Sequence, residues 1–224
     1  MRTPIRSAVT VDDHRLMARH ARGCVILVDD DAEILAALKA LLEMEGYACE
    51  AHATAAACLQ QLGSGAPRFP GPRCVLCDMK MPGMDGLEFQ RRLAELNPIP
   101  LIFMSGGSAT QDAVHAFRGG AVDFMIKPVD ATALLLVVAK ALKADGDRRQ
   151  NFERLGKVTA RVATLTDRER EVARRVAQGQ TNLSIAADLG LALRTVKLHR
   201  QRAMEKIGVS GVTDLVRVAD EAGL

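Results

Sequence analysis

The fold is decided by the stretch Cys74-Val75-Leu76-Cys77-Asp78-Met79-Lys80-Met81-Pro82-Gly83. A short apolar run followed by Pro and Gly is typical of a buried strand that ends in a tight loop. In open α/β sheets, ligand chemistry gathers beyond the carboxyl ends of the strands. The pattern therefore predicts a strand that ends at Asp78 and places this carboxylate where it can react rather than pack.

Three other short apolar runs end in polar residues of a matching kind. They end at Asp29, Asp30 and Asp31, at Ser105, and at Lys127. Acids, a hydroxyl and an ammonium at four strand ends favour a phosphoryl-transfer site around one divalent cation, because Mg²⁺ prefers hard oxygen ligands. Taken singly, each residue has an ordinary interpretation as a turn former, a helix N-cap or a solvated loop residue. The complete set favours the site.

In this order, the residues resemble the receiver domain of two-component response regulators, over roughly residues 23–143. The resemblance implies an α/β fold with a five-stranded parallel sheet, flavodoxin-like and doubly wound. It implies that Asp78 is the phosphorylated residue. It also implies that Asp29 and Asp30 hold Mg²⁺, with Asp30 as the direct ligand, and that Asp78 and the backbone carbonyl of Lys80 complete the metal ligands. Because three Asp residues follow one another, the match to the acidic pair is uncertain by one residue. If the pair is Asp29 and Asp30, Asp31 is the N-cap of the following helix.

Three further roles follow from the same resemblance. Ser105 would bind the phosphoryl group, and Lys127 would neutralise its charge. Phe124, three residues before the lysine, matches the switch aromatic of the family, here without a hydroxyl. The bond between Lys127 and Pro128 is expected to be a cis peptide.

A second domain begins at Leu165-Thr166-Asp167-Arg168-Glu169. Thr166 followed by Glu169 is the sequence pattern of a capping box, which predicts the start of a helix. Three more short helices are expected over 183–189, about 192–207 and 213–222. Short helices separated by tight Gly turns are typical of a helix-turn-helix, so this part is expected to be a small all-α domain.

This second stretch resembles the LuxR-type DNA-binding domain of the NarL/FixJ class, over about residues 163–224. The resemblance rests on Leu165-Thr166-x-Arg168-Glu169-x-Glu171-Val172, Asn182-x-x-Ile185-Ala186 and Arg194-Thr195-Val196-Lys197-x-His199. Two positions depart from the pattern. Leu183-Ser184 replaces the usual charged pair, and Ala192 stands where Ser or Asn normally caps the recognition helix. The missing cap should weaken the helix start by about 0.5–2 kcal/mol relative to Ser.

The long helix of this domain has a face suited to DNA. By helical spacing, this face carries Arg194, Lys197, Leu198, Gln201 and Glu205, whereas Val196, Ala203 and Ile207 lie on the opposite side. In the major groove, base edges would be read by Lys197, Leu198 and Gln201, and phosphates would be contacted by Arg194, Thr195, His199, Arg200 and Arg202. The alternative is a solvated helix face. For His199, packing within the domain and donation to a phosphate are both possible roles.

Charge separates the two halves of the chain. Residues 23–142 carry 9 Lys and Arg against 14 Asp and Glu, a net charge of −5, whereas residues 143–224 carry 16 against 11, a net charge of +5. The formal charge of the whole chain is only +3. A basic domain is the electrostatic signature of a phosphate-backbone binder, so nucleic acid belongs with the C-terminal half.

Length and composition agree with two small domains. The 224 residues are 48% hydrophobic and 3% aromatic, which predicts aliphatic cores. No apolar run spans a bilayer and no signal-peptide pattern is present, so we expect a cytoplasmic protein without membrane contact. All five cysteines lie in the first half. Cys74 and Cys77 have CxxC spacing, but residues i and i+3 of a strand point to opposite faces, so buried free thiols are expected rather than a redox pair or zinc site.

Two segments lie outside the two domains. Residues 144–163 are expected to form a partly helical linker, because Phe152, Leu155 and Val158 recur at helical spacing, although Gly146 and Gly156 favour breaks. Residues 1–22 are basic and aperiodic and are expected to be a disordered tail. Initiation at Met17 is the alternative, in which case residues 1–16 are not translated.

The two resemblances together imply a phosphorylation-controlled transcriptional regulator. A sensor histidine kinase would phosphorylate Asp78, and promoter double-stranded DNA would be bound as a homodimer, on phosphorylation or on DNA, with RNA polymerase as a further candidate partner. Two alternatives stay open: a constitutive DNA binder whose receiver is never phosphorylated, and an output that contacts protein or RNA. An enzyme with turnover is disfavoured because nothing outside the phosphorylation site forms a second catalytic cluster.

Overall fold

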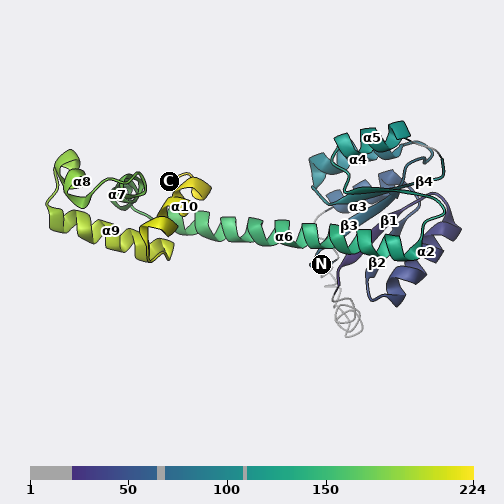
Figure 1. The fold of residues 1–224 in the computed structure, drawn as a ribbon, viewed down its shortest axis with the longest axis horizontal. Helices are drawn as coiled ribbons and strands as arrows, with labels where there is room; N and C mark the ends of the chain where they lie inside the picture. Colours follow the sequence, from purple (N-terminus) through teal and green to yellow (C-terminus); the bar gives the residue numbers. More distant parts are fainter. Residues whose placement is uncertain (1–21, 65–68, 108–109) are drawn as a thin grey trace, which may run out of the picture. The chain divides into compact units, whose positions relative to one another are not determined.

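The computed structural model describes residues 22–64, 69–107 and 110–224 (Figure 1). The chain divides into two compact units between Arg148 and Arg149. The tail expected at residues 1–22 lies outside the described residues, except for Arg22. Among the described residues, no helix is both long and apolar enough to cross a membrane.

A five-stranded parallel sheet forms the centre of the first unit, with strand order β2-β1-β3-β4-β5. The strands are β1 (Cys24–Val28), β2 (Ala48–His52), β3 (Arg73–Asp78), β4 (Leu101–Ser105) and β5 (Asp123–Ile126). Val28 pairs with Cys77, so the next residues, Asp29 and Asp78, emerge side by side at the carboxyl edge. The predicted flavodoxin-like sheet is therefore confirmed.

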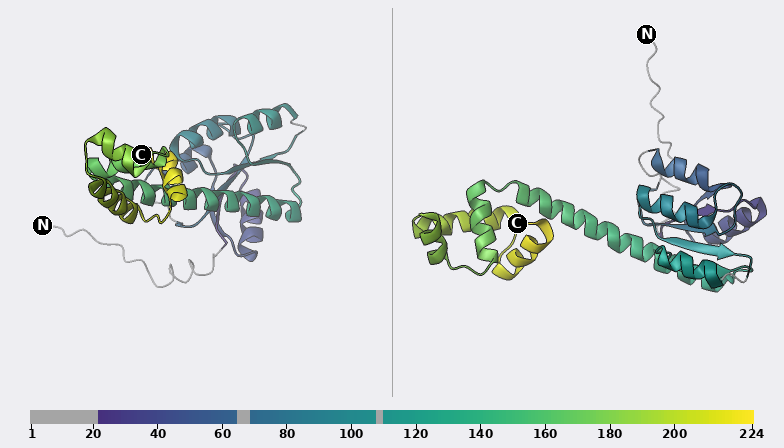
Figure 2. Two further views of the ribbon diagram at one scale, coloured as in Figure 1. Left: turned by 60° about the vertical axis from the view of Figure 1, so that its left-hand side comes forward. Right: turned by 90° about the horizontal axis from the view of Figure 1, so that it is seen from above.

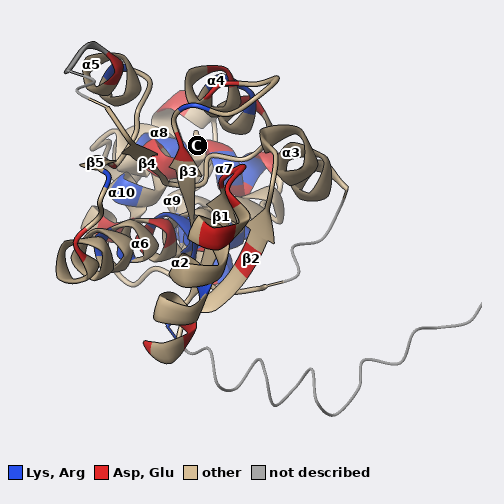
Figure 3. Ribbon diagram, turned by 90° about the vertical axis from the view of Figure 1, so that its right-hand side faces the viewer, with Lys and Arg blue, Asp and Glu red and all other residues tan. Residues whose placement is uncertain are grey.

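Helices cover both faces of this sheet, as an end-on view shows (Figure 3). One face carries α2 (Ala32–Met44) and the first part of α6 (Ala131–Ala163), and the other carries α3 (Ala55–Gly63), α4 (Gly86–Leu96) and α5 (Thr110–Arg118). Alternate residues of β1 point into the two cores, Ile26 toward α3–α5 and Leu27 toward α2 and α6. Because both faces of the sheet are buried, successive residues of a strand are apolar on either side, and the strand sequences are continuous apolar runs.

The cysteines are all free thiols. Cys74 packs in the core under α2 and α6, and Cys77 packs in the core under α3–α5, so the prediction that the CxxC pair splits between two faces is confirmed. Four of the five are buried, whereas Cys49 is only partly buried. Burial raises the pKa of Cys24, Cys49 and Cys58 to about 12. These sulfurs therefore stay protonated and pack as small apolar groups.

The second unit is all helical and contains α7 (Asp167–Ala177), α8 (Asn182–Leu189), α9 (Leu193–Ile207) and α10 (Val212–Ala222) (Figure 2). These bounds agree with the predicted helices to within one residue. The capping box predicted at Thr166 and Glu169 is present, with both reciprocal hydrogen bonds. Val196, Ala203 and Ile207 of α9 are buried in the core of this unit, as their helical spacing predicted.

Helix α6 (Ala131–Ala163) runs unbroken through Gly146 and Gly156, so residues 144–163 are helical throughout rather than partly, and the breaks expected at these glycines are wrong. In the first unit, the buried carboxylate of Asp145 accepts from the backbone N–H of Arg73 at 2.9 Å and pairs with Arg148 at 2.6 Å. In the second unit, Arg154 pairs with Glu221 at 2.9 Å. A helical glycine destabilises by only about 0.5–1 kcal/mol relative to Ala, a small cost that such contacts help to offset.

A buried ion pair joins two helices of the second unit. Glu169, which is 3% exposed, lies 2.6 Å from Lys206 of α9 and accepts from the backbone N–H of Thr166 at 2.9 Å. The hydrogen bond from Lys206 and the bond from Thr166 lower the pKa of Glu169 to about 2. The ionised form is thus favoured by folding, which makes the stability of this unit dependent on pH.

Glu169→Gln should destabilise the second unit at pH 7, because Lys206 loses its charged partner. In the wild type, the folded pKa lies below the unfolded value of about 4.3, so this contribution is complete above that value and is lost as pH falls toward 2. Denaturant unfolding of the full chain at several pH values between 2 and 7 measures it. The variant should lose less stability over this range than the wild type or Glu153→Gln, an exposed control on α6, and an equal loss would contradict the linkage.

Candidate functional site

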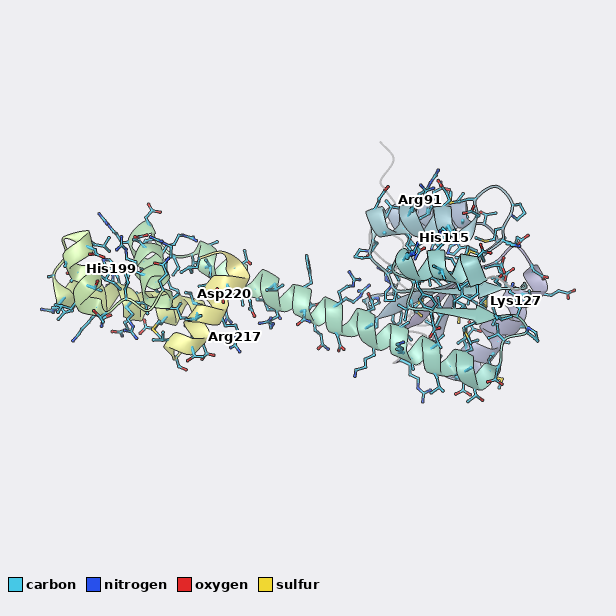
Figure 4. All side chains as sticks on the ribbon, turned by 45° about the horizontal axis from the view of Figure 1, so that its top comes forward. Arg91, His115, Lys127, His199, Arg217 and Asp220 are labelled. Carbon is cyan, nitrogen blue, oxygen red and sulfur yellow. The ribbon has the colours of Figure 1, made fainter. Side chains whose placement is uncertain are left out.

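Four of the predicted residues meet at the carboxyl edge of the first unit's sheet. Asp29 follows β1, Asp78 and Ser105 end β3 and β4, and Lys127 follows β5. Figure 3 shows acidic positions at the ends of β1 and β3, and Figure 4 labels Lys127 at the same edge. The ammonium of Lys127 lies 2.8 Å from Asp29 Oδ2 and 2.5 Å from Asp78 Oδ1. The sheet thus brings two carboxylates and one cation into direct contact.

Backbone amides fix the orientation of both carboxylates. The N–H of Lys80 donates to Asp78 Oδ2 at 2.7 Å, and the N–H of Asp31 donates to Asp29 Oδ1 at 2.9 Å. Each acid therefore has one oxygen held by the main chain and one held by a side-chain ammonium. Asp31 itself accepts from the N–H groups of Glu33 and Ile34, so its expected role as the N-cap of α2 is confirmed.

Lys127 carries its charge firmly in this site. Burial by itself lowers the pKa of Lys127, but hydrogen bonds and charge interactions with Asp29 and Asp78 outweigh burial, and the pKa is raised above its usual value. The side chain is 20% exposed, so part of it remains open to solvent. A charged donor at the edge of a carboxylate pair is suited to stabilising an incoming anionic group.

Ser105 completes the arrangement with a hydroxyl. The residue is 1% exposed, and its Oγ has no hydrogen-bond partner among the described residues. Its carbonyl accepts from the backbone N–H of Lys127 at 2.8 Å, which ties the two strand ends together. A buried hydroxyl without a partner is destabilising unless a ligand supplies one, so Ser105 is suited to bind an oxygen of a bound group.

The same edge offers hard oxygen donors for a divalent cation. Asp30, which directly follows Asp29, is exposed, and the carbonyl of Lys80, two residues after Asp78, is the further oxygen donor expected from the sequence. No three Asp, Glu, His or Cys side chains are arranged to hold a metal ion by themselves within the described ranges. Mg²⁺ usually takes one or two carboxylates and completes its shell with water and phosphate oxygens, so the donors present fit this ion.

The remaining residues predicted for this site lie near it. Phe124 is partly buried and packs against the core beneath α3–α5. The Lys127–Pro128 bond is cis, as expected.

The second candidate site is the exposed face of α9. Arg194, Lys197, Gln201 and Arg202 are exposed, and Leu198 is 42% exposed. Thr195, His199 and Arg200 are partly buried, and Figure 4 labels His199 on this helix. Ala192 occupies the N-cap without a side-chain hydrogen bond, so the predicted missing cap is confirmed. The structure therefore gathers the eight predicted contact residues on one helix.

Two side-chain hydrogen bonds of α9 were not predicted from the sequence. Arg200 donates to Asn182 Oδ1 of α8 at 3.2 Å, and Gln201 Nε2 donates to Glu205 Oε1 at 2.8 Å. The Nδ1 of His199 is buried and has no partner in the described part of the chain, which favours packing for that nitrogen. The spacing of four between Gln201 and Glu205 could have predicted their bond, whereas the pair from two helices could not be read locally.

Two family models match the chain. The model described as the response regulator receiver domain matches residues 25–139, and the model described as bacterial regulatory proteins of the luxR family matches residues 163–219. The first match contains every residue of the strand-edge site, and the second contains all of α9. The chain is thus similar to one family over each of its two units.

Curated proteins and a solved structure resemble the chain over most of its length. The response regulator protein TmoT of Ectopseudomonas mendocina is 38% identical over 88% of this chain and 87% of its own. The transcriptional regulatory protein FixJ of Azorhizobium caulinodans is 36% identical over 89% and 93%. A structure of the response regulator StyR is 32% identical, covers 90% of this chain and 100% of its own, and has a TM-score of 0.78.

Ala192→Ser should stabilise the second unit by about 0.5–2 kcal/mol, because a Ser hydroxyl at the N-cap can accept from a free N–H of the first turn of α9. Denaturant unfolding of the full chain measures the change. Ala192→Val is the control and should give no such gain, since it adds bulk without an acceptor. Equal stability of the Ser and Val variants would contradict the missing-cap interpretation.

Proposed function

The chain belongs to the response regulators that join a receiver domain to a LuxR-type DNA-binding domain, and we propose that Asp78 is its phosphoryl acceptor and α9 its DNA-reading helix. As a member of this family it regulates transcription under the control of phosphorylation, with a histidine kinase as its partner. The observation that carries the residue assignment is the contact of Lys127 with both Asp29 and Asp78.

Asp78 is the nucleophile in the proposed transfer. One of its carboxylate oxygens attacks the phosphorus of a phosphohistidine on the kinase, a P–O bond forms, the P–N bond breaks, and the imidazole leaves with the electron pair. The backbone N–H of Lys80 holds Oδ2 of Asp78 during this step. Lys127, which contacts Oδ1, turns its ammonium to the equatorial phosphoryl oxygens, where the charge of the transition state is spread.

Receiver domains generally use Mg²⁺ at this site, and Asp29, Asp30, Asp78 and the Lys80 carbonyl would hold it here, with Asp30 as the direct ligand of the acidic pair. When bound, the ion neutralises charge on the transferred phosphoryl group. Ser105 then donates its unpartnered hydroxyl to a phosphoryl oxygen. The hydroxyl, ammonium and carboxylates of this chain thus orient the group and hold its charge.

Phosphorylation adds about −1.5 to −2 of charge beside Asp29 and changes the balance at the sheet edge. Movement of Ser105 toward the new group vacates space next to β5, and Phe124, which is only partly buried, turns inward to fill it. The face around α5 and β5 is remodelled in this way. Two copies of the chain then associate, and their α9 helices occupy adjacent half-sites on promoter DNA.

On DNA, α9 lies in the major groove. Lys197, Leu198 and Gln201 read base edges, because they project from the exposed middle of the helix. Arg194, Thr195, Arg200 and Arg202 contact phosphates, and the bond from Arg200 to Asn182 fixes one of these guanidinium groups. His199 would do so only through Nε2, because its Nδ1 is buried. The DNA-bound protein would then change transcription through contact with RNA polymerase.

Asp78→Asn should abolish phosphoryl labelling, because the amide cannot form an acyl phosphate. Incubation of full-length protein with a phosphorylated histidine kinase, followed by measurement of base-labile label, tests this. Asp147→Asn, an exposed position on α6, is the matched control and should be labelled like the wild type. Labelling of Asp78→Asn at the wild-type rate would show that another residue is the nucleophile.

Lys197→Ala should relax base preference at one position of each half-site, whereas Arg202→Ala should weaken binding to all sequences by a similar factor. Selection of bound duplexes from a randomised DNA pool gives the preference, and titration at several salt concentrations gives the loss of a phosphate contact. An unchanged sequence profile for Lys197→Ala would remove Lys197 from the base-reading set.

A further inference from the structure

The polar face of α9 carries an acid whose position does not suit direct base contact. Glu205 is the third residue from the end of α9 and lies eight residues after Lys197, about 12 Å farther along the helix axis. Recognition helices read bases mainly with their N-terminal residues, and a carboxylate close to DNA is repelled by phosphates. Glu205 therefore needs a different explanation from its basic neighbours.

Glu205 is hydrogen-bonded to Gln201, which lies one helical turn before it. Its Oε1 accepts a hydrogen bond from Gln201 Nε2 at 2.8 Å, and both side chains are exposed beside Lys197 along one groove of about 440 Å³. The amide group of an unpaired glutamine can rotate by half a turn, which exchanges the positions of its oxygen and its nitrogen. A carboxylate accepts from the nitrogen and repels the oxygen, so it selects one orientation of this amide.

The hydrogen bond also changes what Gln201 can offer to a base. A glutamine amide has two N–H donors and one carbonyl acceptor. Once Glu205 takes the N–H that points away from the amide oxygen, the other N–H and the carbonyl remain as one donor beside one acceptor. Adenine presents the complementary pair in the major groove, an acceptor at N7 and a donor at N6, whereas guanine presents two acceptors, N7 and O6. Guanine would face the amide oxygen with O6, and that contact is repulsive.

We propose that Glu205 is a positioning residue for base recognition, which makes Gln201 a reader of adenine and excludes guanine at one position of each half-site. This inference rests on the proposed binding of α9 in the major groove. It goes beyond that proposal because it assigns a base to Gln201 and a role to a residue that touches no DNA.

Four full-length proteins test the inference: wild type, Gln201→Ala, Glu205→Ala and Glu205→Gln. Each is treated with acetyl phosphate and used to select duplexes from a randomised DNA pool, and the affinities for the selected site with A or with G at the Gln201 position are then measured. Asp220→Ala on α10 is the control for loss of one negative charge from the same unit (Figure 4). Thermal unfolding of each variant shows that it is folded.

The wild type should favour A over G by about tenfold or more at one position, and Gln201→Ala should remove that preference. Glu205→Ala should bind all sites somewhat more tightly, because a negative charge is lost, but its A-to-G ratio should fall severalfold. Glu205→Gln should retain part of the ratio, since its amide oxygen can still accept from Gln201. Asp220→Ala should leave the ratio unchanged.

Two outcomes would overturn the inference and separate it from the proposed function. If Gln201→Ala removes a base preference but Glu205→Ala keeps the wild-type A-to-G ratio, Gln201 reads DNA without help from Glu205. If the position proves to be C and its preference depends on Glu205 alone, the carboxylate reads cytosine itself. A profile that Gln201→Ala leaves unchanged would instead remove Gln201 from the DNA contacts, and the inference with it.

Discussion

The ion pairs of Lys127 with Asp29 and Asp78 offset the repulsion between two carboxylates at the edge of the sheet. Adjacent parallel strands deliver Asp29 and Asp78 to this place in matching register, where like charges would otherwise repel. The ammonium of Lys127 contacts both at 2.8 and 2.5 Å, and backbone amides fix the remaining oxygens. In the proposed transfer, a phosphoryl group on Asp78 competes for the same ammonium, so the transfer and the rearrangement of this edge would occur together.

The reading of DNA depends on a different kind of constraint, the rigid packing of α9. Val196, Ala203 and Ile207 bury one side of this helix, and the pair between Lys206 and Glu169 ties its end to α7. The opposite side carries exposed polar groups, among which Gln201 donates a hydrogen bond to Glu205 and is proposed to be oriented by it. Base preference on this account comes from hydrogen-bond direction as well as from residue type.

The sequence predicted the features that have a local pattern. Strand ends marked by Asp78 and Lys127, the cap at Asp31 and the capping box at Thr166 follow from spacing and turn chemistry, and the structure contains them. Contacts between distant segments could not be read in this way, such as Asp145 beneath Arg73. The same anchors explain the wrong expectation at the linker glycines, because tertiary contacts hold α6 helical where its sequence favours breaks.

The central claim is that the chemical state of Asp78 controls where α9 binds DNA. Genome-wide DNA occupancy, compared between the wild type and Asp78→Asn at equal protein levels under the inducing stimulus, tests it most directly. The wild type should give discrete peaks that share one sequence motif, and most of these peaks should be lost in the variant. The same peaks at the same heights for Asp78→Asn would show that this protein binds DNA without its phosphoryl switch.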